Sequence, residues 1–183
     1  MAVDLYQPFT NPVTQETFRC LSCTDEAYVM EWIVAPKGYV PFEHIHVSQD
    51  EIFHVKQGEI RVLLNRQQAI GKAGQTVTVP RGTRHIAYNN TPEMLVCVVE
   101  YRPGLDMSRF FQCFGGLTCD RDVSGRYGIN IPKMLYFMRK ANANVLARPA
   151  NIPAPLFDVL MNTFYLVGTF AGWEKLYRKY TEE

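Results

Sequence analysis

The sequence predicts a mainly β domain of the sandwich or barrel type, followed by a group of α-helices. Two observations predict this fold class. From about residue 26 to residue 101, short segments rich in β-branched and aromatic residues alternate with turn residues, without any β-α-β alternation. After Pro103, apolar residues recur at helical spacing instead. With 183 residues the chain suits one domain and an appendage, which we assign to residues 1–103 and 104–183.

The predicted strands are short and are separated by Gly, Pro or Asn. They cover residues 27–34, 41–46, 51–56, 60–64, 75–79, 84–88 and 94–101. Many short strands at this spacing are typical of a sandwich or a barrel. Residues before this block are expected to add lead-in strands.

Two helices are predicted directly after the strands. Asp106 is positioned to cap the first, in which apolar residues recur from Met107 to Phe114. Asn130 and Pro132 have the character of a helix start, and apolar residues at helical spacing follow them.

A third helix, over about residues 157–173, is apolar on most of its circumference and so requires burial on more than one side. A membrane span is disfavoured, because the segment contains Asp158 and Asn162 and is shorter than the roughly twenty apolar residues that a span needs. Packing on the barrel, or on the same helix of a second subunit, is the better interpretation, so we expect a homodimer. Gly168 and Gly172 are expected to break this helix or to allow close approach.

Charge and cysteine content exclude several classes of function. Nineteen Lys plus Arg against eighteen Asp plus Glu give a net charge of +1, without a basic stripe, so nucleic acid is not an expected partner. Residues 1–18 lack a basic leader and an unbroken apolar stretch, and five cysteines, an odd number, indicate reduced thiols; both favour a cytoplasmic protein. Cys20 and Cys23 form a Cys-x-x-Cys, but no second pair completes a zinc site, so we interpret them as ordinary strand cysteines.

Three histidines and one glutamate have the spacing of a metal site. His44 and His46 are two apart on a predicted strand, so their side chains project from the same face. Glu51 follows a short turn and His85 opens a later strand. Taken singly, each histidine would be an ordinary surface or core residue, but three imidazoles and a carboxylate in this order suit one divalent ion of Fe, Mn, Ni, Co, Cu or Zn. His54 alternates with Glu51 along its strand, so it is expected to point outward and to be structural.

These residues belong to two ordered blocks that resemble the motifs of the cupin superfamily. The first, Gly, five residues, His-x-His, three or four residues, Glu, six residues, Gly, is filled by Gly38, His44, His46, Glu51 and Gly58. The second, Gly, five residues, Pro-x-Gly, two residues, His, three residues, Asn, is filled by Gly74, Pro80, Gly82, His85 and Asn89. Ten specified positions constrain the match far more than any single short pattern.

The resemblance implies a double-stranded β-helix, or jelly-roll barrel, with His44, His46, Glu51 and His85 as the metal ligands inside it. It covers roughly residues 25–103. Beyond Tyr101 the sequence resembles a group of small bacterial cupins with helical C-terminal extensions, which implies architecture only.

For function, the leading expectation is an iron- or manganese-dependent oxidoreductase of the dioxygenase kind, since a four-ligand ion keeps open positions for chemistry. We see no acid or base beyond the ligands, which favours metal-centred over proton-transfer chemistry. The alternatives are a metal-dependent isomerase or lyase, a non-catalytic module that binds or senses a small ligand, and a dimeric scaffold with a structural metal.

By strand alternation, Phe42, Phe53, Val55 and Ala87 share the faces of the ligands and would form an apolar wall for a small substrate with an oxygen group.

Overall fold

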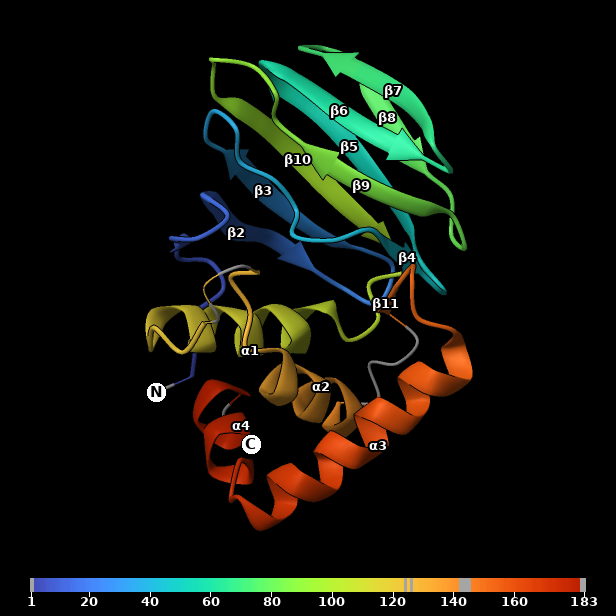
Figure 1. Ribbon diagram of the computed structural model, residues 1–183. Helices are drawn as coiled ribbons and strands as arrows, with labels where there is room; N and C mark the ends of the chain where they lie inside the picture. Colours follow the sequence, from blue (N-terminus) through green and yellow to red (C-terminus); the bar gives the residue numbers. More distant parts are fainter. Residues whose placement is uncertain (1, 124, 126, 142–145, 182–183) are drawn as a thin grey trace.

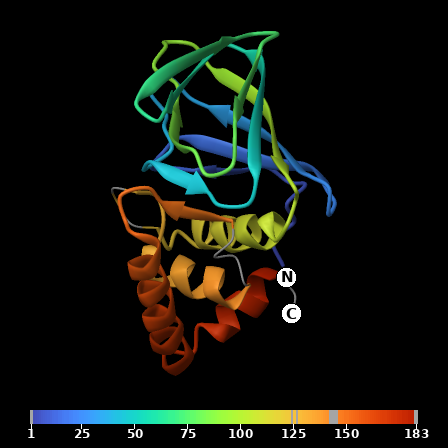
Figure 2. The same cartoon turned by 90° about the vertical axis from the view of Figure 1, so that its right-hand side faces the viewer.

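The computed structural model describes residues 2–123, 125, 127–141 and 146–181, which form a β-barrel with helices gathered at one end (Figures 1 and 2). The strands are β1 (Phe9–Asn11), β2 (Glu16–Cys23), β3 (Tyr28–Val34), β4 (His44–His46), β5 (Asp50–Gln57), β6 (Glu59–Leu64), β7 (Gln67–Lys72), β8 (Thr76–Val79), β9 (Arg84–Tyr88), β10 (Leu95–Arg102) and β11 (Ala147–Pro149). The helices are α1 (Met107–Cys119), α2 (Ile131–Lys140), α3 (Ala154–Phe170) and α4 (Glu174–Thr181).

The strands form two antiparallel sheets, one in the order β1-β2-β3-β10-β5-β8 and one in the order β11-β4-β9-β6-β7. From β3 to β10, consecutive strands lie in different sheets except for β6 and β7, which is the topology of a jelly roll. The predicted mainly β fold with C-terminal helices is therefore confirmed.

Alternation of apolar and polar residues aims one side of each strand into the barrel. Along β3 every second residue, from Tyr28 to Val34, is buried, and the same alternation recurs on β5 and β10. The register places Tyr101 of β10 between Tyr28 and Glu51. Glu51 therefore shares the inner face of the sheet with an aromatic row.

Two residues of the matched motifs hold the barrel loops in place. Gly58 has a φ of 77°, and a Cβ there would lie 2.4 Å from the Met94 carbonyl oxygen, so only glycine fits this turn. The buried Asn89 amide donates to the carbonyl oxygens of Val34 (3.1 Å) and Glu93 (2.7 Å) and so joins two turns.

Helix α1 closes the end of the larger sheet that the smaller sheet leaves open (Figure 1). Phe111 stacks on Tyr28 with ring centroids 5.3 Å apart and also contacts Phe18 of β2. Asp106 does precede α1, but its side chain makes no capping hydrogen bond, contrary to the prediction. Asn130 does cap α2, since its side chain accepts from the Lys133 backbone N–H at 3.2 Å.

The third helix has its predicted length of 17 residues, but it begins and ends three residues earlier and is less buried. Gly172, with a φ of 73°, ends the apolar helix α3 and a separate helix, α4, follows. Gly168 allows close approach, because a Cβ there would lie 2.3 Å from the Tyr136 ring. Within the single chain α3 packs on α2 and leaves a face exposed that includes Leu156, Val159, Leu166, Val167 and Phe170.

Two strands were not predicted, β7 and β11. The short β11 precedes α3 in the chain and pairs with β4, with Ala147 opposite His46. The C-terminal region thus contributes a strand to the barrel itself as well as helices beside it. Among the described helices none is by itself long and apolar enough to cross a membrane, and α3 and α4 meet such a test only as a pair bent by 96°.

Candidate metal centre

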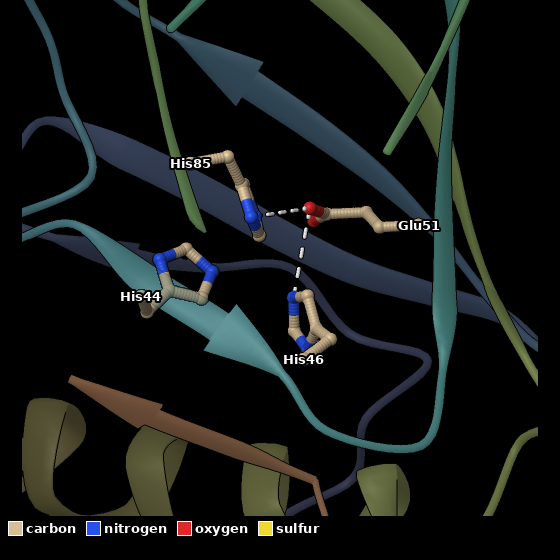
Figure 3. A group of neighbouring side chains, drawn as sticks. All are labelled: His44, His46, Glu51 and His85. Carbon is tan, nitrogen blue, oxygen red and sulfur yellow. Dashed lines mark ion pairs between the residues drawn. The ribbon is translucent and has the colours of Figure 1, made fainter. Parts of the chain in front are cut away.

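His44, His46, Glu51 and His85 converge inside the barrel (Figure 3). Each offers one ligand atom, and these atoms all lie within 4.8 Å of one another. Two of the side chains come from β4, one from β5 and one from β9.

The local fold brings these strands together for identifiable reasons. In the antiparallel pair of β4 and β9, His44 lies opposite His85. The turn that contains Pro80 presents the Gly82 backbone N–H to the His46 carbonyl oxygen at 2.7 Å. Between β4 and β5 the fully buried Gln49 donates to the carbonyl oxygens of Pro103 (2.7 Å) and Gly104 (3.0 Å), which fixes the turn that leads into Glu51.

Backbone carbonyls set the orientation of two of the imidazoles. His85 Nδ1 lies 2.9 Å from the Thr83 carbonyl oxygen, and His44 Nδ1 lies 3.3 Å from the Phe42 carbonyl oxygen. Because a carbonyl oxygen only accepts, each Nδ1 carries the proton and each Nε2 keeps its lone pair. Histidine ligands of metals are commonly oriented in this way, by a hydrogen bond from the ring nitrogen that does not bind the ion.

Buried polar atoms without a hydrogen bond indicate that the cluster fits a metal ion. Among the described residues, both ring nitrogens of His46, Nε2 of His85 and Oε2 of Glu51 are buried and lack a hydrogen-bond partner. Glu51 Oε2 lies 2.9 Å from His85 Nε2 and 3.5 Å from His46 Nε2, but these contacts lack hydrogen-bond geometry. Such orphaned groups are costly unless something else satisfies them, and one divalent cation would satisfy three of these atoms at once, namely one ring nitrogen of His46, Nε2 of His85 and Oε2 of Glu51.

The protonation states of His44 and Glu51 agree with those of metal ligands, whereas the pKa of His85, which burial would lower, is raised by its contact with Glu51. Burial, and then the neighbouring His85 and His46, lowers the pKa of His44 well below its ordinary value, so this imidazole is neutral. Burial alone would raise the pKa of Glu51, but His46 and His85 outweigh it and hold the pKa well below its usual range. The site therefore offers an ionised carboxylate and a neutral imidazole without prior deprotonation.

His54 lies outside the cluster, on the outer side of the sheet, as its alternation with Glu51 predicts. Its Nε2 lies 3.0 Å from Glu100 Oε1 and its Nδ1 lies 3.2 Å from the Thr76 hydroxyl. These contacts give it a structural role.

The four residues open into a cavity of about 430 Å³. Its volume is within the range of pockets that hold small organic molecules. The barrel supplies one wall, and the helices and β11 supply the other, with apolar side chains that include Met107, Phe110, Phe111, Met134, Leu135, Phe157 and Leu160. The predicted apolar surroundings thus extend well beyond the barrel.

Of the residues expected to contact a substrate, Phe42, Phe53 and Ala87 line this cavity together with the four candidate ligands. Val55 is buried in the barrel core and is not among the described lining residues, because it lies two positions further along β5 from the ligand end than Phe53. Strand alternation predicts which face of the sheet a side chain points to, but it does not predict how far along the strand the cavity extends. Phe53 therefore lines the cavity and Val55 does not.

Sequence reasoning missed two polar residues of the site. Glu16, 3% exposed, lines the cavity from β2, and Tyr101 lines it beside Glu51. The expectation that the pocket holds no acid beyond the ligands is therefore wrong. The sequence did contain a signal for Glu16. Glu16, Phe18 and Cys20 alternate along one strand, which predicts that the Glu16 side chain lies on the same buried face as the two apolar residues.

Comparison with known families gives a match to the Cupin domain over residues 30–101, the segment that holds all four candidate ligands. This match identifies residues 30–101 as a cupin domain, in agreement with the barrel and the two motifs. No curated protein sequence matches the chain.

Solved structures with a similar barrel share little sequence with the chain. A protein with a double-stranded β-helix domain from Klebsiella pneumoniae is 22% identical over 57% of this chain and 79% of its own, with a TM-score of 0.45. KdgF from Halomonas is 22% identical over 53% of this chain and 86% of its own, with a TM-score of 0.47. A sugar phosphate isomerase from Silicibacter pomeroyi is 18% identical over 49% of this chain and 60% of its own, with a TM-score of 0.45.

Proposed function

We propose that this cupin is a metal-dependent oxidoreductase of the dioxygenase kind that acts on a small, largely apolar molecule bearing an oxygen donor. One observation carries the proposal: the convergent ligand set opens directly into a cavity whose other lining is predominantly apolar and aromatic. A structural metal site would be closed by its ligands and would not need such a cavity.

The chain's own residues would hold the metal through Nε2 of His44 and His85, one ring nitrogen of His46, and the Glu51 carboxylate. When bound there, an iron or manganese ion would supply Lewis acidity and one-electron chemistry toward dioxygen. The aromatic and aliphatic lining would exclude water and orient the apolar part of the substrate.

Tyr101 is suited to support the same site. Its hydroxyl is buried beside Glu51, and its ring lies 5.1 Å from that of His46. Burial, and then the charge of Glu51, raises the pKa of Tyr101 well above its ordinary value, so the phenol stays protonated. The neutral phenol donates its hydrogen bond to the Glu51 carboxylate and so can hold this candidate ligand in place.

A metal-dependent isomerase or lyase is the second candidate, and Glu16 is the observation that favours it. Proton transfer needs an acid or a base beyond the ligands, and a buried carboxyl group in the cavity provides one.

Oxygen uptake by the metal-reconstituted protein tests the proposal. The apo protein is loaded separately with Fe²⁺, Mn²⁺ and Zn²⁺ and offered catechols, β-diketones and thiols, with oxygen consumption and substrate loss followed together. We expect iron- or manganese-dependent oxygen consumption coupled to loss of one substrate class. The matched variants are His46→Ala, which should abolish it, and His54→Ala, which should not.

Each other outcome points to a different function. Substrate loss without oxygen consumption would favour the isomerase or lyase. Tight binding of the same molecules with no turnover under any metal would favour a binding or sensing module and would overturn the enzymatic proposal.

A further inference from the structure

Glu16 is a buried carboxyl group that the metal centre does not use. It lies on the inner face of β2, lines the cavity and is 3% exposed. The next inward residues on the same strand are Phe18 and Cys20, so the acid stands in an otherwise apolar row.

The contacts of Glu16 supply hydrogen-bond donors and no cation. Its Oε1 accepts a hydrogen bond from Trp32 Nε1 at 3.0 Å. Across the sheet it faces Asn11 of β1 and Val34 of β3, and the Asn11 amide is already engaged with the Gly128 carbonyl oxygen. Among the described residues, no Lys, Arg or His contributes to its pKa.

These surroundings keep the group protonated at neutral pH. Burial raises the pKa of Glu16 to about 8, and the hydroxyl of Thr14 and the indole of Trp32 lower it only in part. The titratable group that its charge reaches is Tyr101 on β10, which itself stays neutral. An indole N–H can only donate, so it does not use the acid's own proton.

We propose that Glu16 is a ligand-recognition residue, which as a carboxylic acid donates a hydrogen bond to an uncharged oxygen acceptor of the molecule bound in the cavity. The proposal rests on the proposed function in one respect, namely that the cavity binds a small molecule whose other oxygen group lies at the metal centre. The substrate class becomes an uncharged aromatic or aliphatic molecule with two oxygen functions.

In an apolar cavity, a single buried hydrogen-bond donor distinguishes ligands that carry an oxygen acceptor from those that lack one. Hydrophobic contacts separate molecules of similar shape poorly, whereas a buried donor left without its acceptor penalises an analogue that lacks the oxygen. A ligand that places a carboxylate near Glu16 would bury a charge in an apolar site without a cation beside it, which disfavours its binding.

A matched pair of probes tests the proposal, naphthalene and 2-acetylnaphthalene, which differ by one ketone. Binding of each to the full-length protein is measured from tryptophan fluorescence about two pH units below and above the Glu16 pKa of about 8. Below it, we expect roughly three- to tenfold tighter binding of the ketone, as one neutral hydrogen bond provides. Above it, the ionised carboxylate has no proton to donate, and the preference should disappear.

Glu16→Gln should keep the preference at both pH values, because its amide N–H donates without titrating. Glu31→Gln, the same change on the outer face of the adjacent β3, should behave as the native chain does. As a second readout, the infrared C=O band of a protonated carboxylic acid should be lost in Glu16→Gln and retained in Glu31→Gln. A native chain with no preference, or a pH dependence that persists in Glu16→Gln, would overturn the proposal.

The two proposals fail separately. Because the probes need no turnover, the titration is run on metal-loaded and on chelator-treated protein. A pH-dependent preference without oxygen chemistry would leave Glu16 in its role and remove the dioxygenase. Oxygen consumption without a pH-dependent preference for the ketone would support the dioxygenase and would overturn the role of Glu16.

Discussion

The two walls of the cavity have different compositions. The barrel wall carries the polar chemistry, namely the four candidate ligands, Glu16 and Tyr101, whereas the helical wall contributes mainly apolar side chains from α1, α2 and α3. Strand register fixes a side chain to a face and a row, so a sheet can hold ligand atoms within a few ångströms. The helices are held by packing, which defines a shape and excludes water. Under the proposed function, the barrel would therefore supply the polar groups of the site, and the helices would shape the apolar part of the cavity.

The largest effect is expected from the helical wall, on stability. Phe111→Ala removes a buried ring that stacks on Tyr28 and should cost about 3–5 kcal/mol in the free energy of unfolding. Metal affinity should be unchanged, because the ligands belong to the barrel. Urea denaturation and metal titration measure the two quantities. The same change at Tyr6, which is 58% exposed, is the control and should stay within about 0.5 kcal/mol. Lost metal affinity in folded Phe111→Ala would contradict the division between the walls.

On the barrel wall, Glu16 should make stability depend on pH. The folded state keeps its proton up to a pKa of about 8, whereas the unfolded state releases it near the ordinary glutamate pKa of 4.5. The unfolded state binds fewer protons between these values, so stability is full below the lower pKa and is lost as pH rises through the upper one, by on the order of 4 kcal/mol.

Urea denaturation across this pH window measures that loss. Glu16→Gln should remove most of the difference, and Glu31→Gln should retain it. An equally steep pH dependence in Glu16→Gln would mean that another group is responsible.

The metal ligands should act on ion affinity. His46→Ala should lower the affinity for a divalent transition metal by tenfold or more, because one of four convergent ligands is lost. His54→Ala should leave it nearly unchanged, since His54 contacts Glu100 and Thr76 on the other side of the sheet. Competition with a chelating dye measures both. The reverse order would mean that the ion binds elsewhere.

The smallest effect on the single chain is expected from the exposed face of α3. Leu156, Val159, Leu166 and Phe170 recur at spacings of three, four and seven, which form one stripe on a helix. We propose that this stripe joins two copies of the chain, as the predicted homodimer requires.

Phe170→Ser should then change the unfolding free energy of one chain by no more than about 0.5 kcal/mol, since the ring is 90% exposed, but should convert the dimer to a monomer. Sedimentation velocity measures the oligomeric state. A monomeric native protein, or a variant that stays dimeric, would contradict the proposal.

Local patterns in the sequence predicted the barrel well. Seven strands, the turns between them and the helix starts at Asp106 and Asn130 follow from alternation, Gly and Pro positions and capping residues. Alternation did not predict which of the inward-facing residues on a strand lie at the cavity. Val55 and Phe53 share a face, but only the folded barrel decides which of them reaches the cavity.

By itself the sequence determined the fold class and the four candidate ligands, because residue spacing on strands is a local property that the printed chain already contains. Only the tertiary structure decided that Glu16 lines the same cavity as the metal centre, that β11 pairs with the His46 strand, and that three helices complete the pocket. These are contacts between segments up to more than a hundred residues apart. They arise from the closure of the barrel and the packing of helices on its end, and no short-range pattern encodes such closure.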